Sequence, residues 1–304
     1  PVARAGGVLL ANVSPRGRWI NGQTAVMQLD GWSAREMTLT APSGLSLTWR
    51  HMMPRDDDAK KQAKQREQKI IEFDELLDRV RRYEASREQS PETTATDLRL
   101  ESLLPVVRGE LPLIVQANLQ AEIESAIAYT QRQGLKLILF GGYDAVKSKE
   151  LLTEYDIPVL VAGTYRRPIR RDDAYDDAYT LPARLRKAGI RFAIGGHGAG
   201  SPQGSSNARN LPYHAAAAVA FGLSVDDAIR SITLSPAEIF GVADRVGSLT
   251  VGKDATIIVS DGDILQTESN VVRAFIQGRD VDLSSRHTML FEKYRRKVAA
   301  GRSQ

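Results

Sequence analysis

The middle of the chain alternates short apolar runs with segments of helical periodicity, and this alternation limits the fold more than any other feature. Strands are predicted at 113–117, 135–140, 157–161 and 191–194, and helices at 119–133, 143–155, 177–188 and 212–221. Strands that alternate with helices of this length form parallel βαβ units. The runs are apolar throughout, as expected when helices cover both faces of a sheet. The sequence therefore predicts an α/β fold, either an open doubly wound sheet or a (β/α)8 barrel.

The segment 56–89 separates this alternating region from two earlier predicted strands, at 8–13 and 45–49. Most of its residues are Lys, Arg, Glu, Asp or Gln, but apolar residues recur at helical spacing, namely Ile70, Phe73, Leu77 and Val80. One apolar stripe on a polar helix is typical of a helix that packs by one face and is solvated on the other. We therefore expect a long amphipathic helix here, followed by a polar linker.

The C-terminal part changes character and is predicted to form a separate small β unit. Glycine-punctuated sequence leads into strand-like runs at 256–260 and 271–276, and Gln277-Gly278 indicates a tight turn after the second run. The expected organisation is a β/α unit over 1–245, which includes the charged helix, a small β unit over 246–282 and a helical tail over 283–304.

Composition excludes several kinds of site. The chain has no Cys, which excludes disulfides, thiolate nucleophiles and Cys-ligated zinc. It has no apolar run long enough to span a membrane, and its 41 basic and 37 acidic residues leave little surplus charge. We therefore expect no membrane partner and no nucleic-acid partner. We expect a small-molecule substrate or ligand, and a homo-oligomer is possible. The chain starts at Pro1 without Met, so we expect an upstream segment, and a soluble protein in the cytoplasm or exported.

Candidate binding residues follow the predicted strands, because ligands of parallel α/β folds lie at the carboxyl ends of strands. The polar or glycine residues at these ends that we expect to bind substrate are Gln116, Asn118, Gly141, Gly142 and Tyr143. Asn210 lies before the last helix and is a further candidate to orient a polar ligand, or else it caps that helix. The acidic pairs at 172–173 and 176–177 indicate a solvated loop rather than a metal site.

Two of the four histidines are candidate catalytic residues. His197 stands in a glycine-rich loop after a predicted strand, and His214 lies one turn into a predicted helix. Either imidazole is a candidate general base, while a solvated loop residue or a packing residue is the alternative. His51 and His287 carry weaker arguments. The chain has no H-x-H, no H-E-x-x-H, no Walker motif and no nucleophile elbow.

The C-terminal motifs identify a family resemblance. Gly247-Ser248-Leu249, Gly252-Lys253-Asp254-Ala255 and 257–263, with 228–237 before them and 272–281 after them, resemble the signature of the amidohydrolase superfamily, in particular of imidazolonepropionase-related amidohydrolases. The resemblance implies a (β/α)8 TIM-type barrel, N-terminally incomplete in this chain, with a small appended β-sandwich part. It also implies metal-dependent hydrolysis of C–N bonds other than peptide bonds.

The family's metal-ligand positions are largely replaced in this chain. By the resemblance, Gln116 stands where the fifth-strand His is expected, Gly141 or Gly142 where the sixth-strand His is expected, and 195–197 holds no carboxylate at the eighth-strand position. We therefore predict a degenerate metal site and assign no metal ligand. Zinc would be expected only if an upstream segment supplied ligands. Three alternatives remain: a hydrolase with a reduced site, an inactive barrel that binds a small molecule or protein partner, and metal-free hydrolysis with His197 or His214 as base.

Overall fold

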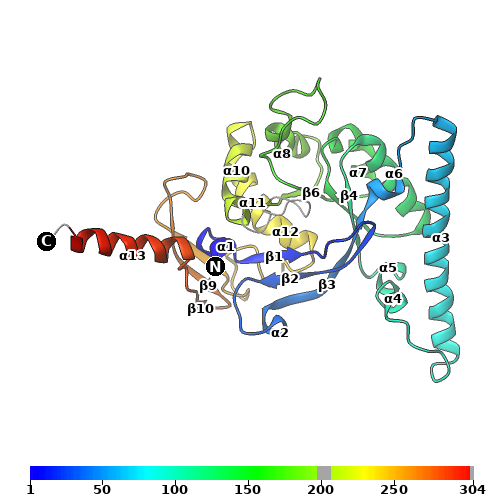
Figure 1. Cartoon of the computed structure of the whole chain (residues 1–304), viewed down its shortest axis with the longest axis horizontal. Helices are drawn as coiled ribbons and strands as arrows, with labels where there is room; N and C mark the ends of the chain where they lie inside the picture. The colour runs from blue at the N-terminus through cyan, green and yellow to red at the C-terminus, as the bar shows by residue number, and fades with distance from the viewer. Residues whose placement is uncertain (197–206, 302–304) are drawn as a thin grey trace.

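A seven-stranded sheet forms the centre of the molecule (Figure 1). The structure is a computed structural model that describes residues 1–196 and 207–301. The strands are β1 (Leu10–Val13), β2 (Ile20–Gln28), β3 (Thr38–Thr48), β4 (Leu113–Ala117), β5 (Leu137–Gly141), β6 (Val159–Val161) and β7 (Phe192–Ile194). They lie in sequence order: β2 is antiparallel to both of its neighbours, β1 and β3, and β3 to β7 are parallel.

This strand order decides between the two predicted architectures. In a doubly wound sheet the order reverses at a switch point, whereas here each parallel strand pairs with the next one along the chain. Right-handed crossovers between consecutive neighbours place all their helices on the same face, which is the construction of a barrel. The α/β fold is therefore confirmed, and the parallel strands form half of a β/α barrel.

The helices follow the predicted alternation. Those of the β/α part are α6 (Gln120–Gln133), η2 (Ala145–Ser148) with α7 (Lys149–Glu154), α8 (Asp177–Lys187), η3 (Ala208–Asn210) with α10 (Leu211–Ala220), α11 (Val225–Ile232) and α12 (Leu234–Ile239). Gly134 ends α6 with φ +67°, the left-handed conformation that glycine adopts without strain. Shorter elements are α1 (Val2–Ala5), α2 (Ala34–Met37), η1 (Trp49–Met52), α4 (Leu98–Glu101) and α5 (Leu104–Val107).

Alternate residues of the parallel strands point to opposite faces of the sheet. One set, which includes Leu47, Val115, Leu139 and Val161, is buried in the large hydrophobic core shared with the helices. The other set lies on the opposite face, which we call the inner face. Packing of the first set fixes where every residue of the second set points, because a one-residue slip in register would exchange the two faces.

The charged segment forms a single helix, α3 (Ala59–Gln89), as predicted. Asp58 caps its start by accepting hydrogen bonds from the amides of residues 60 and 61. Of the predicted apolar stripe, Phe73, Leu77 and Val80 are fully buried. Phe73 stacks on Tyr129 of α6 with ring centroids 5.0 Å apart. The stripe therefore attaches a largely polar helix to the outside of the sheet.

The C-terminal part contains a small antiparallel sheet and a final helix. β8 (Ile257–Ser260), β9 (Val271–Ile276) and β10 (Arg279–Asp280) make an antiparallel sheet, and α13 (Arg286–Gly301) follows it. The predicted turn is confirmed, since Gln277 and Gly278 both have positive φ. A small core of Leu9, Ala274, Ile276 and Val281 joins this sheet to the N-terminal segment.

Strand β2 was not predicted from the sequence. Its first half contains Asn21, Gly22 and Gln23, which interrupt the apolar alternation that identifies a strand. The first half of β3, which contains Pro42 and Gly44, was missed for the same reason. Both segments are held by antiparallel pairing with each other, so the sheet decides their conformation rather than local propensity.

We expect Phe73→Ala to destabilise the protein by about 3–5 kcal/mol, because it leaves a cavity between α3 and α6. Chemical denaturation followed by circular dichroism measures the change. Ile71→Ala is the matched control on the same helix, where the side chain is 41% exposed, and it should cost about 1 kcal/mol or less. Equal losses for the two variants would contradict the packing described here.

Candidate functional site

A row of in-register side chains crosses the inner face at the carboxyl ends of the strands. Thr48, Gln116, Phe140, Leu160 and Ala193 are consecutive register partners on β3 to β7. The first four are only partly buried, unlike the core residues beside them. The side-chain amide of Gln116 has no hydrogen-bond partner among the described residues, so it is available to a ligand. Gln116 thus lies between a hydroxyl and an aromatic ring, as a polar group on a surface that the helices do not cover.

Polar groups continue this row onto β2. Asn21 donates hydrogen bonds to the hydroxyls of Ser46 at 3.0 Å and Thr48 at 3.2 Å. Its carbonyl oxygen Oδ1 is buried and finds no partner in the part of the chain that the structure describes. The inner face is therefore polar over β2 and β3 and becomes apolar towards β6 and β7.

The backbone conformation and the close packing of the turn after β5 explain why glycine stands at both Gly141 and Gly142. Gly141 and Gly142 both have positive φ, +100° and +65°, where side chains are strained. A Cβ on Gly141 would overlap Oδ1 of Asn118, and one on Gly142 would lie 2.7 Å from Cγ1 of Val159. The same approach buries Oδ1 of Asn118 without a described partner. The turn after β5 thus packs against the end of β4, and a ligand-binding role for these residues stays a prediction.

The ring of Tyr143 makes a cation–π contact with an arginine. The guanidinium of Arg166, in the segment after β6, lies 3.9 Å from the centre of the Tyr143 ring. Arg166 donates a 2.7 Å hydrogen bond to Asp177 at the start of α8, and Asp177 also accepts one from Arg184. A chain of charges therefore connects the ends of β5 and β6 to α8.

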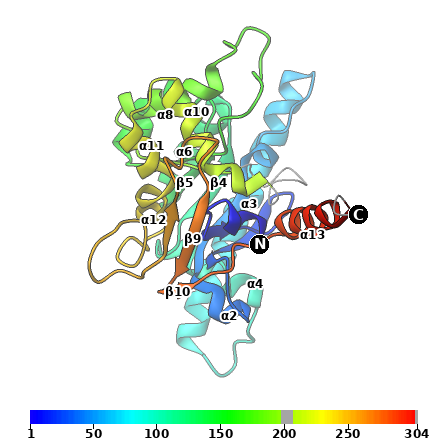
Figure 2. The same cartoon turned by 90° about the vertical axis from the view of Figure 1, so that its left-hand side faces the viewer.

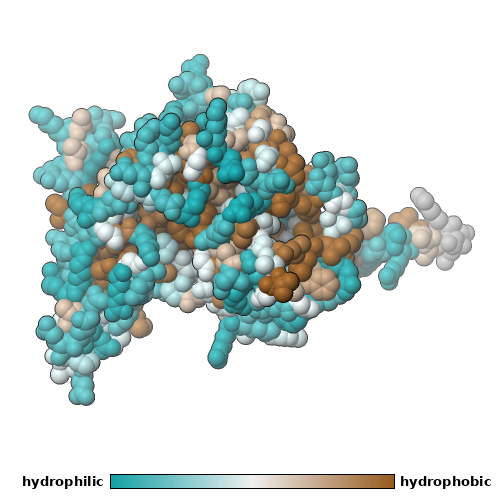
Figure 3. Space-filling view, turned by 180° about the vertical axis from the view of Figure 1, so that it is seen from behind, coloured by the Kyte–Doolittle hydropathy of each residue, from teal (hydrophilic) through white to brown (hydrophobic). Residues whose placement is uncertain are grey.

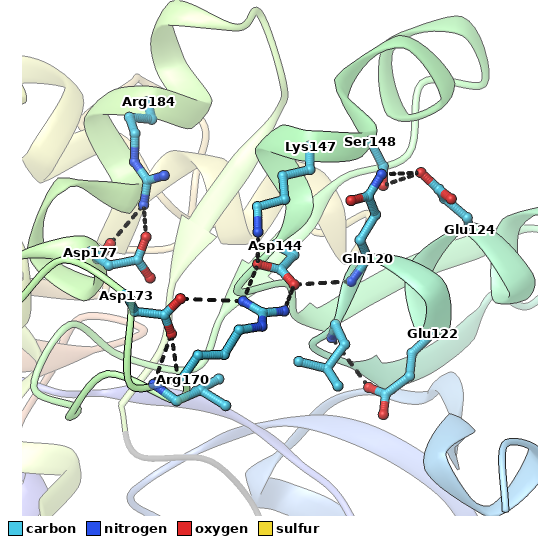
Figure 4. A network of polar contacts seen from close by, with 12 residues as sticks. Gln120, Glu122, Glu124, Asp144, Lys147, Ser148, Arg170, Asp173, Asp177 and Arg184 are labelled. Atoms are coloured by element: carbon cyan, nitrogen blue, oxygen red, sulfur yellow. Dashed lines mark hydrogen bonds and ion pairs between the residues drawn. The ribbon is translucent and has the colours of Figure 1, made fainter. Parts of the chain in front are cut away.

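Asp144 is the centre of a second charged network (Figure 4). Its carboxylate accepts hydrogen bonds from both terminal nitrogens of Arg170, from the first backbone amide of α6 at Gln120, and forms an ion pair with Lys147. Burial alone would raise the pKa of Asp144, but these donors outweigh it and lower the pKa to about 2. Arg170 also pairs with Asp173 in its own segment. Its bonds to Asp144 connect the segment after β6 to the turn after β5.

His214 is fully buried at the end of β6. Its Nδ1 accepts a 3.1 Å hydrogen bond from the backbone amide of Thr164, which requires a neutral imidazole with its proton on Nε2. The Thr164 hydroxyl donates to the backbone carbonyl of His214 at 3.1 Å. Gly163 leaves room for the ring, since a Cβ there would lie 3.1 Å from its Cε1. Nδ1 is therefore committed to a structural bond, and only Nε2 could take part in proton transfer.

The predicted site residues are brought together only in part. Gln116, Asn118, Gly141, Gly142 and Tyr143 lie on the neighbouring ends of β4 and β5. Asn210 precedes α10, and its side chain forms no cap bond. His197 lies outside the described residues. Within 1–196 and 207–301, no three His, Asp or Glu side chains are grouped so that they could hold a metal ion.

The loop charges were misjudged from the sequence. The acidic pairs at 172–173 and 176–177 were expected to be solvated, but Asp173 and Asp177 are engaged in ion pairs with Arg170 and Arg166. Those arginines were not predicted as site residues. The signal was present, because four arginines and four aspartates lie between 166 and 177, spaced so that opposite charges can meet across a turn.

We expect Asp144→Asn to destabilise the protein by about 2 kcal/mol at neutral pH, because the carboxylate has a pKa of about 2 against an ordinary 3.8. This stabilisation is complete above pH 4 and is lost as the pH falls towards 2. Thermal melts across this range measure it, and the difference between wild type and variant should shrink with acidification. Asp172→Asn, at an exposed side chain in the same loop, is the control with little expected effect.

Comparison with known proteins places this geometry in a family. Residues 168–289 match the model of the amidohydrolase family. A 72-residue segment, 24% of this chain, is 35% identical to "Amidohydrolase tasK" of Hapsidospora irregularis, but it spans only 7% of that protein.

Solved structures give a longer match. An amidohydrolase from Thermotoga maritima MSB8 has a TM-score of 0.77 and 26% identity, and the alignment covers 92% of this chain and 73% of that one. A 5-methylcytosine deaminase from Klebsiella pneumoniae, at a TM-score of 0.53 and 13% identity over 81% and 57% of the chains, shares the fold. The family match, the curated relative and the Thermotoga structure together show that this chain belongs to the amidohydrolase superfamily.

Proposed function

We propose that this chain is an amidohydrolase-superfamily protein with a degenerate metal site, and that its strand ends bind a small polar molecule. One observation carries the proposal: the end of β4 presents the amide of Gln116, and the adjacent end of β5 presents glycines, at two positions where the family resemblance implies histidines. The incomplete burial of Gln116 and Phe140 supports ligand binding at these strand ends, and the lack of metal-binding side chains there supports a changed role.

The chemistry of these residues does not fit a catalytic transition metal. A neutral amide oxygen is a weak ligand for zinc, and glycine offers no side-chain donor. The buried carboxylates at these strand ends are already engaged, Asp144 by Arg170, Lys147 and an amide of α6, and Glu122 by the backbone amides of Asn118 and Leu119. His214 has one nitrogen committed to Thr164. No step through a metal ion is therefore derived from the described residues.

The same residues suit a neutral polar ligand. Gln116 can donate and accept hydrogen bonds, and the half-buried ring of Phe140 in register beside it offers an apolar contact. Tyr143 is fixed by Arg166 at the neighbouring strand end. A small molecule with an amide or similar group and an apolar portion would satisfy these neighbours, which agrees with the general composition of small-molecule sites.

Hydrolysis of C–N bonds other than peptide bonds is the second candidate. It is favoured by the 26% identity to the Thermotoga amidohydrolase over most of this chain. Its candidate bases are His214, through Nε2 alone, and His197, which lies outside the described residues. Because the chain covers 73% of that structure, the activity of the whole protein remains a proposal.

We expect the purified chain, after incubation with zinc and dialysis, to retain well under one equivalent of zinc, manganese or iron by elemental analysis. Gln116→Ala should leave that value unchanged. A stoichiometric metal that is lost in Gln116→Ala would overturn the proposal and favour the hydrolase. A stoichiometric metal that survives this substitution would also contradict it, by showing that other residues form a complete site.

A further inference from the structure

Helix α13 projects from the body of the molecule (Figures 1 and 2). It leaves the small sheet after β10, and in both views no other described element runs beside it. Its start is fixed, because Ser285 is buried and exchanges backbone-to-hydroxyl hydrogen bonds with Thr288 at 2.8 and 3.3 Å. Val281, a few residues earlier, is buried in the core of the small sheet. The helix is thus anchored at its base, and no other described element packs beside it.

One face of this helix is apolar. Leu290, Phe291, Tyr294 and Val298 recur at spacings of three and four residues, so they form a stripe, and they line a shallow groove together with His287. Their exposed fractions are 39%, 65%, 54% and 56%. Figure 3 shows tan and brown spheres on the projecting helix beside hydrophilic ones. Exposed apolar stripes of this kind mark interaction surfaces.

The rest of the helix surface is strongly basic. Of the chain's 41 basic and 37 acidic residues, α13 holds five and one, so the remainder of the chain is electrically balanced. At 100° per residue, Lys293 and Lys297 border the stripe on one side and Arg295 borders it on the other. The whole positive surplus of the chain is therefore concentrated around one exposed apolar stripe.

We propose that α13 binds the surface of an anionic lipid bilayer, with its apolar stripe inserted at the level of the headgroups. A narrow apolar face flanked by Lys and Arg is the pattern of helices that lie in a membrane interface. Basic side chains at its borders reach lipid phosphates while their stems cover apolar surface. Insertion at the interface needs no spanning segment, and no helix of the described residues is both long and apolar enough to cross a bilayer.

A second copy of the chain is a poorer occupant of the same stripe. Two α13 helices packed face to face would bring their bordering cations together, because each helix has five basic residues and one acidic residue. Like charges beside a helix–helix seam oppose pairing. This proposal departs from the expectation of no membrane partner, which rested on the lack of an apolar run long enough to span a bilayer, because a helix that lies in the interface needs no such run.

Co-sedimentation of the full chain with vesicles tests the proposal. Vesicles of phosphatidylcholine and phosphatidylglycerol at three to one should bind at least about tenfold more protein than pure phosphatidylcholine, and high salt should reduce binding by screening. Phe291→Ala with Tyr294→Ala, and separately Lys293→Gln with Lys297→Gln, which removes the two cations on one border of the stripe, should each lower binding about tenfold. Alanine and glutamine favour helix, and circular dichroism confirms that each variant remains folded.

Matched controls lie elsewhere on the surface. Leu249→Ala with Val251→Ala removes two side chains that are 85% and 104% exposed, and Arg79→Gln with Arg82→Gln removes two exposed cations from α3; neither should change binding. Absence of binding, or equal binding to both vesicles, would overturn the proposal. So would a concentration-dependent dimer in light scattering that Phe291→Ala with Tyr294→Ala abolishes, because the stripe would then be an interface between two copies.

Discussion

The parallel register from β3 to β7 is the constraint on which the rest of the structure depends. It commits one set of side chains to the core beneath the helices and leaves the alternate set on the inner face. Gln116 can be a ligand-facing residue only because Val115 and Ala117 on either side of it are buried in that core. The same register brings the carboxyl ends of five strands to one edge, where Gln116, Asn118, Gly141, Gly142 and Tyr143 are found.

Hydrophobic periodicity was sufficient to predict helices and strands where one pattern continues over a whole segment. β4 lies exactly over the predicted 113–117, α6 begins one residue later than predicted, and α3 retains three of its four predicted anchors. The motifs of the C-terminal part led to the superfamily, and the comparisons bear this out. Strand β2 could not be predicted, because its conformation comes from pairing with distant residues of β1 and β3.

The location of the candidate residues at strand ends was predictable, but their contacts were not. Strand ends nominate Gln116 and Tyr143, yet the cation over the Tyr143 ring comes from the segment after β6, and sequence spacing does not show which carboxylate each arginine will choose. His214 shows that residue type alone can also suggest a chemical role that the contacts restrict. Its residue type suggests a base, but its pairing with the Thr164 amide shows a buried structural bond at Nδ1. Which nitrogen of a histidine is occupied depends on tertiary neighbours.

The tight turn after β5 limits which side chains its two glycine positions could carry. Gly141 and Gly142 hold left-handed backbone, and neither has room for a Cβ beside Asn118 and Val159. A single codon change to histidine at either position would therefore strain the chain before it could supply a ligand. A histidine at either position would require the neighbouring side chains to move first, so the conformation of this turn itself disfavours a side-chain ligand at these two strand-end positions.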